Sequence, residues 1–417
     1  FAKIKSGKWQ LESNLDLNDL SHDPAFFDFN ISYPYEYQLI SDINDLTYKN
    51  NDKRKIIRSK RELRKNSYII LTKKSNFNLY DLGKIKIYSD IKNEVDKSDS
   101  LINKAIIYID KKTGNYIPLN KPNENKIEKK SIVNKIYNYT EKKIGKYPFD
   151  KMVISKKNQS RRPIYGINNL PNIISPFSES FLFEFNFLKE FLHTYFEESI
   201  SFHKRKDYWI IDGMVIYLLM DYVDTYYPNL KLIGKYSDLK ILKNRNYANY
   251  SFNEQFRLFE NIISSRNIGQ SINTTLDSLT RINLKIINPY KSGIGMKMLS
   301  NILSKETIET SIRDYFKKNS LNRSNNSSFK SILENNGFAK SNWFFEEYLQ
   351  KKLFKDFSIK NINSTANNTF FKITKHYDSK IPVQLSLIKN NKVIKNKWLD
   401  IKKRDTIVSF NSNFYDF

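Results

Sequence analysis

The spacing of apolar and polar residues divides the chain into three regions. In the first, up to about residue 130, short runs of β-branched and aromatic residues alternate with polar turns, as in SYIILTKKSNFNLYDLGKIKIYSDI. This pattern predicts β-strands. The stretch KAIIYIDKKTGNYIPL predicts a β-hairpin, with Gly114 and Asn115 supplying its turn.

The second region begins after the linker-like stretch NKPNENKIEKK, where the apolar spacing lengthens to about 3.6 residues. Ile132, Ile136, Tyr139 and Ile144 fall near one face of a predicted helix that stops at Gly145. The pattern stays mainly helical up to about residue 358.

The third region, residues 359–417, returns to alternating runs that predict a β-meander or half of a sandwich. We therefore predict an α+β fold with three domains. They are a β-rich N-terminal domain at 1–130, a mainly helical domain at 131–358, and a β-sandwich domain or its start at 359–417.

Composition narrows the classes of partner. The formal net charge of +26 would attract polyanions, but the excess is mostly lysine in a chain rich in Asn and Ile, as an AT-rich coding sequence produces. We therefore do not expect a nucleic-acid partner. The most basic run, Lys49 to Lys65, predicts an exposed loop or solvated face, with a polyanion-contacting patch as the alternative.

Two absences exclude further classes. The sequence has no cysteine, which excludes disulfides, thiolate metal sites and cysteine nucleophiles. No apolar run approaches the roughly 20 residues that a membrane-spanning helix needs.

The stretch FLFEFNFLKEFLHTYFEESISF carries the candidate chemistry. It predicts a helix capped by Ser175, with Glu179 complementing the N-terminal dipole. Lys189 and His193 are four residues apart and share a face, with Glu190 beside them. Two histidines at this spacing bind zinc in many proteases, and the Glu after the first is the general base. E-x-x-H alone is more often a feature of core packing.

A second helical stretch, YWIIDGMVIYLLMDYV, places Asp212 19 positions after His193. Together, KEFLHTYFEE…YWIIDGMVIYL resembles the H-E-x-x-H…W-x-x-E-G-x-x-x-Y core of the aminopeptidase N family of gluzincin zinc metallopeptidases. Trp209, Gly213 and Tyr217 are in register with that core.

Other segments resemble the family in the same order, over about residues 140 to 360. YTEKKIGKYPFDKMVI resembles the entry to the catalytic domain, RRPIYGINNL the G-x-M-E-N substrate strand, NPYKSGIGMKMLSNIL the Y-x-K-G-x-x-x-L-x-x-L helix, and SNWFFEEYL the S-W-F-F-x-x-W motif. The resemblance implies a thermolysin-like domain between β-rich domains, of which the N-terminal one is shorter than usual and is expected to be truncated or gapped. It also implies that Tyr290 stabilises the oxyanion and that Gly166 and Asn169, or Asn168 if the register shifts by one, contact substrate.

The departures from the family all fall on its chemistry. Lys189 replaces the first zinc histidine, Asp212 replaces the third ligand, and Asn169 replaces the acidic residue that binds the substrate amine. His193 and Asp212 would be remnant metal ligands, whereas Glu190 and Tyr290 are retained catalytic positions. Catalytic zinc needs three protein ligands, so we expect no cofactor, with zinc bound only if the protein is active.

Two arrangements of Lys189 remain open. Its ammonium could lie between Glu190 and Asp212 in a salt-bridged pseudo-site, or it could reach solvent from the helix edge.

The leading functional hypothesis is an inactive aminopeptidase-like protein that binds or scaffolds a peptide or protein partner. We expect it in an extracytoplasmic, membrane-associated complex of a bacterial cell envelope. One alternative is an active metallo-aminopeptidase with an unusual ligand set, in which Lys189 is deprotonated or a residue such as Glu197 completes the site. The other is a basic polyanion-binding protein.

Overall fold

The computed structural model groups the chain into two compact units, which are described separately below. It describes residues 3–10, 23–44, 47–51, 53–91, 107–109, 116–118, 128–156, 175–243, 246–324, 326–337, 342–352, 357–365, 368–377, 379–389 and 392–411. The first unit comprises Phe1–Leu11, Leu20–His203 and Ile312–Ser324, and the second comprises Glu12–Asp19, Lys204–Ser311 and Asn325–Phe417. The predicted domain boundaries at residues 130 and 358 stay predictions.

The first unit contains the β-rich region. Its strands are β1 (Lys3–Lys5), β2 (Lys8–Gln10), β3 (Ala25–Phe27), β4 (Asn30–Pro34), β5 (Gln38–Ser41), β6 (Thr47–Asn51), β7 (Arg54–Arg58), β8 (Glu62–Arg64), β9 (Ile69–Thr72), β10 (Asn78–Asp81), β11 (Lys86–Ser89), β12 (Ile107–Ile109), β13 (Tyr116–Pro118), β14 (Lys151–Ile154), β15 (Ser201–Phe202) and β16 (Arg323–Ser324). They pair in small sheets, including β4-β7-β6, β3-β8, β5-β9 and β10-β11-β14. The predicted hairpin is confirmed as the antiparallel pair β12-β13, while its turn residues lie outside the described part of the chain.

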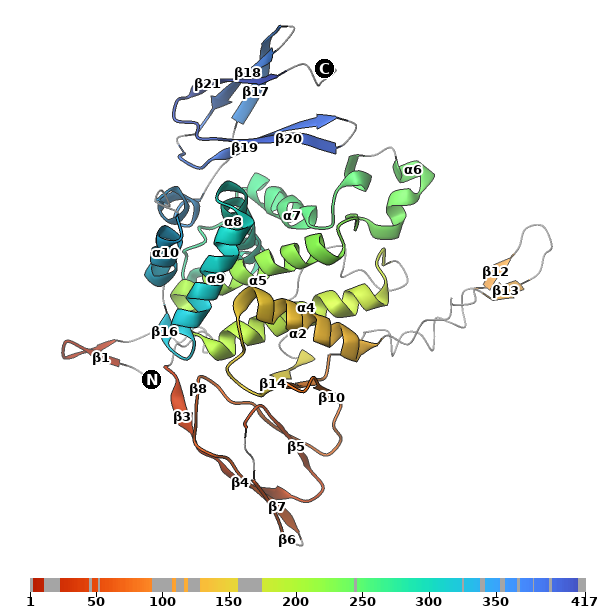
Figure 1. Cartoon of the computed structure of the whole chain (residues 1–417), viewed down its shortest axis with the longest axis vertical. Helices are drawn as coiled ribbons and strands as arrows, with labels where there is room; N and C mark the ends of the chain where they lie inside the picture. Colours follow the sequence, from red (N-terminus) through yellow and green to blue (C-terminus); the bar gives the residue numbers. More distant parts are fainter. Residues whose placement is uncertain are drawn as a thin grey trace. The chain divides into compact units, whose positions relative to one another are not determined.

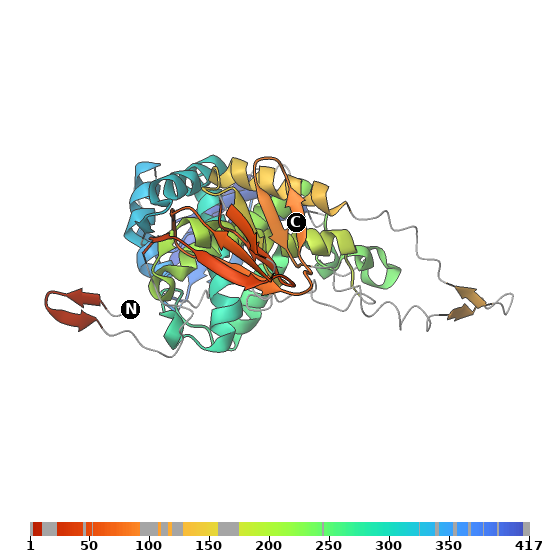
Figure 2. The same ribbon diagram turned by 90° about the horizontal axis from the view of Figure 1, so that it is seen from below.

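Two helices of the first unit lie against these strands (Figures 1 and 2). They are α2 (Lys129–Ile144) and α4 (Glu179–Ser199). Helix α2 ends at Gly145, as predicted, and buries Ile136, Tyr139 and Ile144. On α4, Phe187 packs edge-on against Tyr80 of β10, with ring centroids 6.1 Å apart. The apolar face of α4 therefore rests on the N-terminal strands.

The basic run from Lys49 to Lys65 is not a loop, but six of its nine cations are exposed, as the solvated-face alternative predicted. It forms strands β6, β7 and β8, and its last two cations point inward. Arg64 is fully buried, lies 2.6 Å from Glu62 and stacks on the ring of Phe149. Lys65 donates to the carbonyl oxygen of Ile200. These two cations hold the fold together and are not available to a polyanion.

The helices of the second unit are α5 (Lys204–Tyr226), α6 (Lys240–Lys243), α7 (Glu254–Ser265), α8 (Asn288–Ile302) and α10 (Asn326–Asn335), with π-helical turns at Asn283–Ile287 and Trp343–Tyr348 and 3-10 turns at Gly234–Asp238, Asn246–Asn249 and Leu276–Ser278. Helix α9 (Lys305–Asn319) begins in this unit. No helix among the described residues is long and apolar enough to cross a membrane.

Helix α8 packs closely against α5 and against the turn Trp343–Tyr348 because it carries two glycines. A Cβ atom at Gly293 would lie 2.3 Å from Cγ2 of Ile216 on α5, well inside contact distance. A Cβ atom at Gly295 would lie 2.5 Å from the ring of Tyr348. Glycine at both positions lets the backbone of α8 approach its neighbours.

The C-terminal strands confirm the predicted return to β structure. They are β17 (Phe357–Ser364), β18 (Asn368–Lys375), β19 (Val383–Lys389), β20 (Lys392–Leu399) and β21 (Asp405–Asn411). They form the sheet β17-β18-β21 and the ribbon β19-β20, both antiparallel. A small core that includes Ile373, Val408 and Phe410 lies between them. The predicted α+β class is therefore confirmed.

Candidate functional site

Helix α4 presents most of the candidate residues. It begins at Glu179, and the hydroxyl of Ser178 caps it by accepting from the backbone N–H of Phe181 at 3.3 Å. The prediction that Ser175 caps this helix was wrong, because Ser175 lies about one turn before the true cap. Its hydroxyl instead accepts from the N–H of Phe177. Glu179 lies in the first turn, as predicted.

A row of aromatic rings runs along one face of α4. Phe183, Phe187, Phe191 and Tyr195 recur every four residues, and each ring contacts the next at centroid distances between 5.6 and 6.3 Å. Residues four apart lie on one face of a helix. The hydroxyl of Tyr195 donates to the carbonyl oxygen of Gly145, which ties α4 to the end of α2. Burial raises the pKa of Tyr195 far above its usual value, so the hydroxyl stays protonated.

A second row on α4 is polar and equally buried. Lys189, His193 and Glu197 also recur every four residues, and Glu190 adjoins them. Their exposed fractions lie between 1% and 7%. Ionisable side chains are rarely buried this deeply without partners. The structure thus places these four predicted residues together in the interior.

Lys189 and Glu190 form an ion pair. The ammonium Nζ lies 2.7 Å from Oε1 of Glu190, and the two side chains are 3% and 1% exposed. The alternative in which Lys189 reaches solvent from the helix edge is therefore wrong. The further expectation that Asp212 shares this ammonium stays a prediction, because Asp212 belongs to the other unit.

The donor set does not fit a catalytic zinc ion. A protonated lysine has three donors and no lone pair, so it cannot be the first ligand. Its ammonium also contacts a carboxylate oxygen of Glu190, and Glu190 is the residue that would serve as general base. In the part of the chain that the structure describes, no three His, Asp or Glu side chains are grouped so that they could hold a metal ion.

The other predicted site residues that the structure describes, Asp212 and Tyr290, belong to the second unit. Asp212 is on α5 and lines a small pocket of ≈ 10 Å³ with Arg205, Trp209 and Asn288, which leaves room for about one water molecule. Tyr290 on α8 is 1% exposed and packs edge-on against Phe256, with centroids 5.0 Å apart. The substrate-strand positions Gly166, Asn168 and Asn169 lie outside the described residues.

The three residues in register with the second motif all have packing roles. Trp209 contacts the rings of Phe329, Phe344 and Phe345 edge-on. Gly213 lies where a Cβ atom would be 3.3 Å from the carbonyl oxygen of Ser292. The hydroxyl of Tyr217 donates to Ser300. These contacts hold helix α5 against α8 and against the rings of Phe329 and Phe345 in the second unit.

The polar contacts at the end of α4 were not predicted from the sequence. Lys65 donates to Ile200, and Asn66 donates to Oε1 of Glu198 at 3.4 Å. Both donors follow strand β8, and Lys65 is the last residue of the basic run. No local signal distinguishes the inward cations from the exposed ones.

Comparisons with known proteins support the fold. No protein-family model and no curated protein matches the sequence. Aminopeptidase A from Legionella pneumophila, solved in complex with aspartic acid, aligns with 93% of this chain and 42% of its own, at 11% identity and a TM-score of 0.58. An M1 zinc metallopeptidase from Deinococcus radiodurans aligns with 81% of this chain and 66% of its own, at 10% identity and a TM-score of 0.48.

The chain spans less than half the length of the Legionella protein. At such low identity the likeness concerns the fold alone. The protein has the α+β fold of an aminopeptidase.

Proposed function

We propose that the protein is a catalytically inactive, aminopeptidase-like binding subunit. The observation that carries this proposal is the buried ion pair between Lys189 and Glu190. An ammonium in place of the first metal ligand supplies a positive charge beside the would-be general base. The pair therefore takes the electrostatic role of a metal without its chemistry.

The chemical consequence is large. Zinc lowers the pKa of a bound water from 15.7 to about 7, and a general base then needs to remove only a weakly held proton. Glu190 paired with an ammonium has no such water to act on. Hydrolysis by the zinc route would then be lost, even though Glu190, His193 and Tyr290 are retained in the sequence.

The retained packing supports a binding role. Trp209, Gly213 and Tyr217 keep helix α5 against its neighbours, so the fold survives changes in the ligand set. We propose a peptide or protein partner and a place in an extracytoplasmic, membrane-associated complex. The polyanion-binding alternative loses only Arg64 and Lys65, which are buried, from its best candidate patch.

The test is zinc stoichiometry by elemental analysis, on protein purified without chelator and without a polyhistidine tag. We expect well under one zinc per chain in the native protein. The Lys189→His, Asp212→Glu double variant restores the ligand types of the family and should approach one zinc per chain.

A matched control carries the same two substitutions at exposed positions. The Lys142→His, Asp238→Glu variant should bind no more zinc than the native chain, because both side chains face solvent. One firmly held zinc in the native chain would overturn the proposal. It would favour the active enzyme with Glu197, one turn after His193, as the added ligand.

A further inference from the structure

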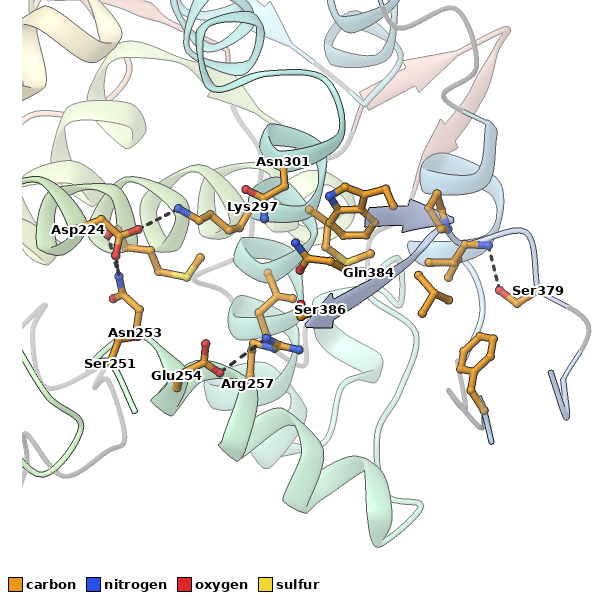
Figure 3. A pocket seen from close by; sticks show the side chains of 18 of the residues that line it. Asp224, Ser251, Asn253, Glu254, Arg257, Lys297, Asn301, Ser379, Gln384 and Ser386 are labelled. Atoms are coloured by element: carbon orange, nitrogen blue, oxygen red, sulfur yellow. Dashed lines mark hydrogen bonds and ion pairs between the residues drawn. The ribbon is translucent and has the colours of Figure 1, made fainter. Parts of the chain in front are cut away.

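A cavity in the second unit shares no residue with the candidate site. Its volume is ≈ 470 Å³, within the range typical of small-ligand sites. Helices α5, α7 and α8 line one side, and β17, β19, β20 and the segment before β19 line the other (Figure 3).

The charges at the helical side of the cavity are paired among themselves. Lys297 lies 2.9 Å from Asp224, which also accepts from the side-chain amide of Asn253 at 2.8 Å. Arg257 lies 3.7 Å from Glu254. Two cations and two anions cancel, so a strongly charged ligand such as a phosphate would have to separate an existing pair. The cavity therefore favours a ligand without net charge.

Apolar side chains make up much of the remaining wall. They are contributed by Met220, Ile294, Met298, Pro382 and Trp398. Methionine side chains are flexible and polarisable, so they adapt to ligands of different shape. This wall suits an aliphatic or aromatic group.

Side-chain amides complete the lining from both sides. Asn301 is on α8, and Gln384 extends toward it from β19 (Figure 3). Each amide offers donors and an acceptor, the same pair of functions that a peptide unit presents. Two amides on opposite walls can therefore bind the main chain of an extended segment.

We propose that this cavity binds an uncharged peptide segment, with one apolar side chain seated against Met220, Met298 and Trp398. Gln384 and Asn301 bind the main chain beside that side chain. A sugar would satisfy the amides and could stack on Trp398, but it has no aliphatic group for the methionine wall. A peptide satisfies both.

The methionines allow the proposal to be tested in the intact protein. The chain has five: Met152, Met214, Met220, Met296 and Met298. Only Met220 and Met298 of these line the cavity, and the other three are fully buried elsewhere. NMR of ¹³C-methyl-labelled methionine should show saturable shifts of the Met220 and Met298 signals on titration with the blocked peptide N-acetyl-Ala-Leu-Ala-amide.

Two variants separate the site from general effects. Gln384→Leu removes the amide but keeps the volume, and it should weaken binding roughly fivefold, as loss of one or two hydrogen bonds predicts. Gln38→Leu makes the same change at an exposed position of β5 and should leave the titration unchanged. The five methyl signals of each variant show directly whether it is folded.

Three outcomes would overturn the proposal. The first is no shift up to the solubility limit of the peptide. The second is a response that is not specific to the cavity. This would be shifts of equal size at all five methionines, or a Gln384→Leu titration identical to the native one. The third is a saturable response to maltose at Met220 and Met298 without a response to the peptide, which would assign the cavity to a carbohydrate.

Discussion

Lys189 and Glu190 are charged residues from which water is almost excluded. Removing one partner of a buried ion pair leaves the other charge uncompensated and typically costs about 3–5 kcal/mol. We expect Lys189→Met to lower the free energy of unfolding by about this amount, measured by urea denaturation. Replacing both residues removes the stranded charge, so Lys189→Met with Glu190→Met should recover part of the loss.

The exposed lysine Lys142 provides the comparison for this experiment. Lys142→Met should change the free energy of unfolding by no more than about 0.5 kcal/mol, as is usual for surface substitutions. If Lys189→Met were as mild as Lys142→Met, the buried pair would have no energetic weight.

Asp42 gives a pH-dependent contribution to stability. It is buried, and burial raises the pKa of its carboxyl group although Arg64, Tyr68 and Ser67 act in the opposite direction. The folded state therefore keeps this proton to a higher pH than the unfolded state, where Asp titrates near pH 3.9. The contribution of Asp42 is most favourable below that pH and declines as pH rises through the folded pKa.

Asp42→Asn removes this titration and keeps the shape of the side chain. The stability of the native protein relative to this variant should decline as pH is raised from about 4 to about 7. Urea unfolding of both proteins at several pH values measures the difference. Arg64 lies 3.4 Å from the carboxylate of Asp42, and a difference that increases with pH would show that this ion pair outweighs burial.

At the scale of elements, the start of α4 separates two similar serines. Ser178 caps the helix, whereas Ser175 lies a turn earlier and bonds to the backbone of Phe177. Loss of an N-cap hydroxyl costs about 1 kcal/mol. Ser178→Ala should therefore lower the free energy of unfolding by about that amount and more than Ser175→Ala does, as measured by urea denaturation. Ser180→Ala, inside the first turn, should be neutral or slightly stabilising, because alanine favours helices.

The elements themselves were largely predictable, and their ends less so. The spacing of apolar residues is a local property. Alternation identified the C-terminal strands, and a spacing of about 3.6 residues identified the helix ending at Gly145. The choice between Ser175 and Ser178 was not local, since both precede residues suited to a first turn. The side chains of Arg64 and Lys65 point inward because their partners lie there. These partners, Asp42, Phe149 and Ile200, are distant in sequence.

The candidate site also combines features that local sequence indicates with features that depend on distant residues. The pairing of Lys189 with Glu190 was one of two arrangements that the sequence left open. The burial of this pair was not predicted, because burial depends on what covers helix α4. The cavity lined by Met220, Lys297 and Gln384 was not predicted at all, since its walls come from segments that share no sequence pattern.

At the scale of the whole molecule, the net charge of +26 should produce weak and non-specific binding to polyanions. Binding to a labelled random-sequence DNA duplex, followed by fluorescence anisotropy, should fall steeply between about 50 and 200 mM salt. We expect this binding to follow the net charge and not one patch, although six cations of the basic run are exposed.

Two triple variants measure how much the basic run contributes to DNA binding. Each replaces three exposed lysines with glutamine. The first changes Lys49, Lys53 and Lys60, and the control changes Lys142, Lys317 and Lys318. Both should weaken DNA binding to the same extent. A much larger loss in the first variant would restore the basic run as a binding surface.

The glycine at position 293 also limits how the second unit can move. Ile216 occupies the space that a side chain at Gly293 would fill. Sliding α8 along α5 by one turn would bring Pro289 or Lys297 to that place, and neither leaves room for Ile216. Shear between these helices is therefore blocked, and the part of the cavity wall that α8 supplies is rigid before any ligand arrives. Adaptation to a ligand is left to the methionine side chains and to the β19-β20 ribbon.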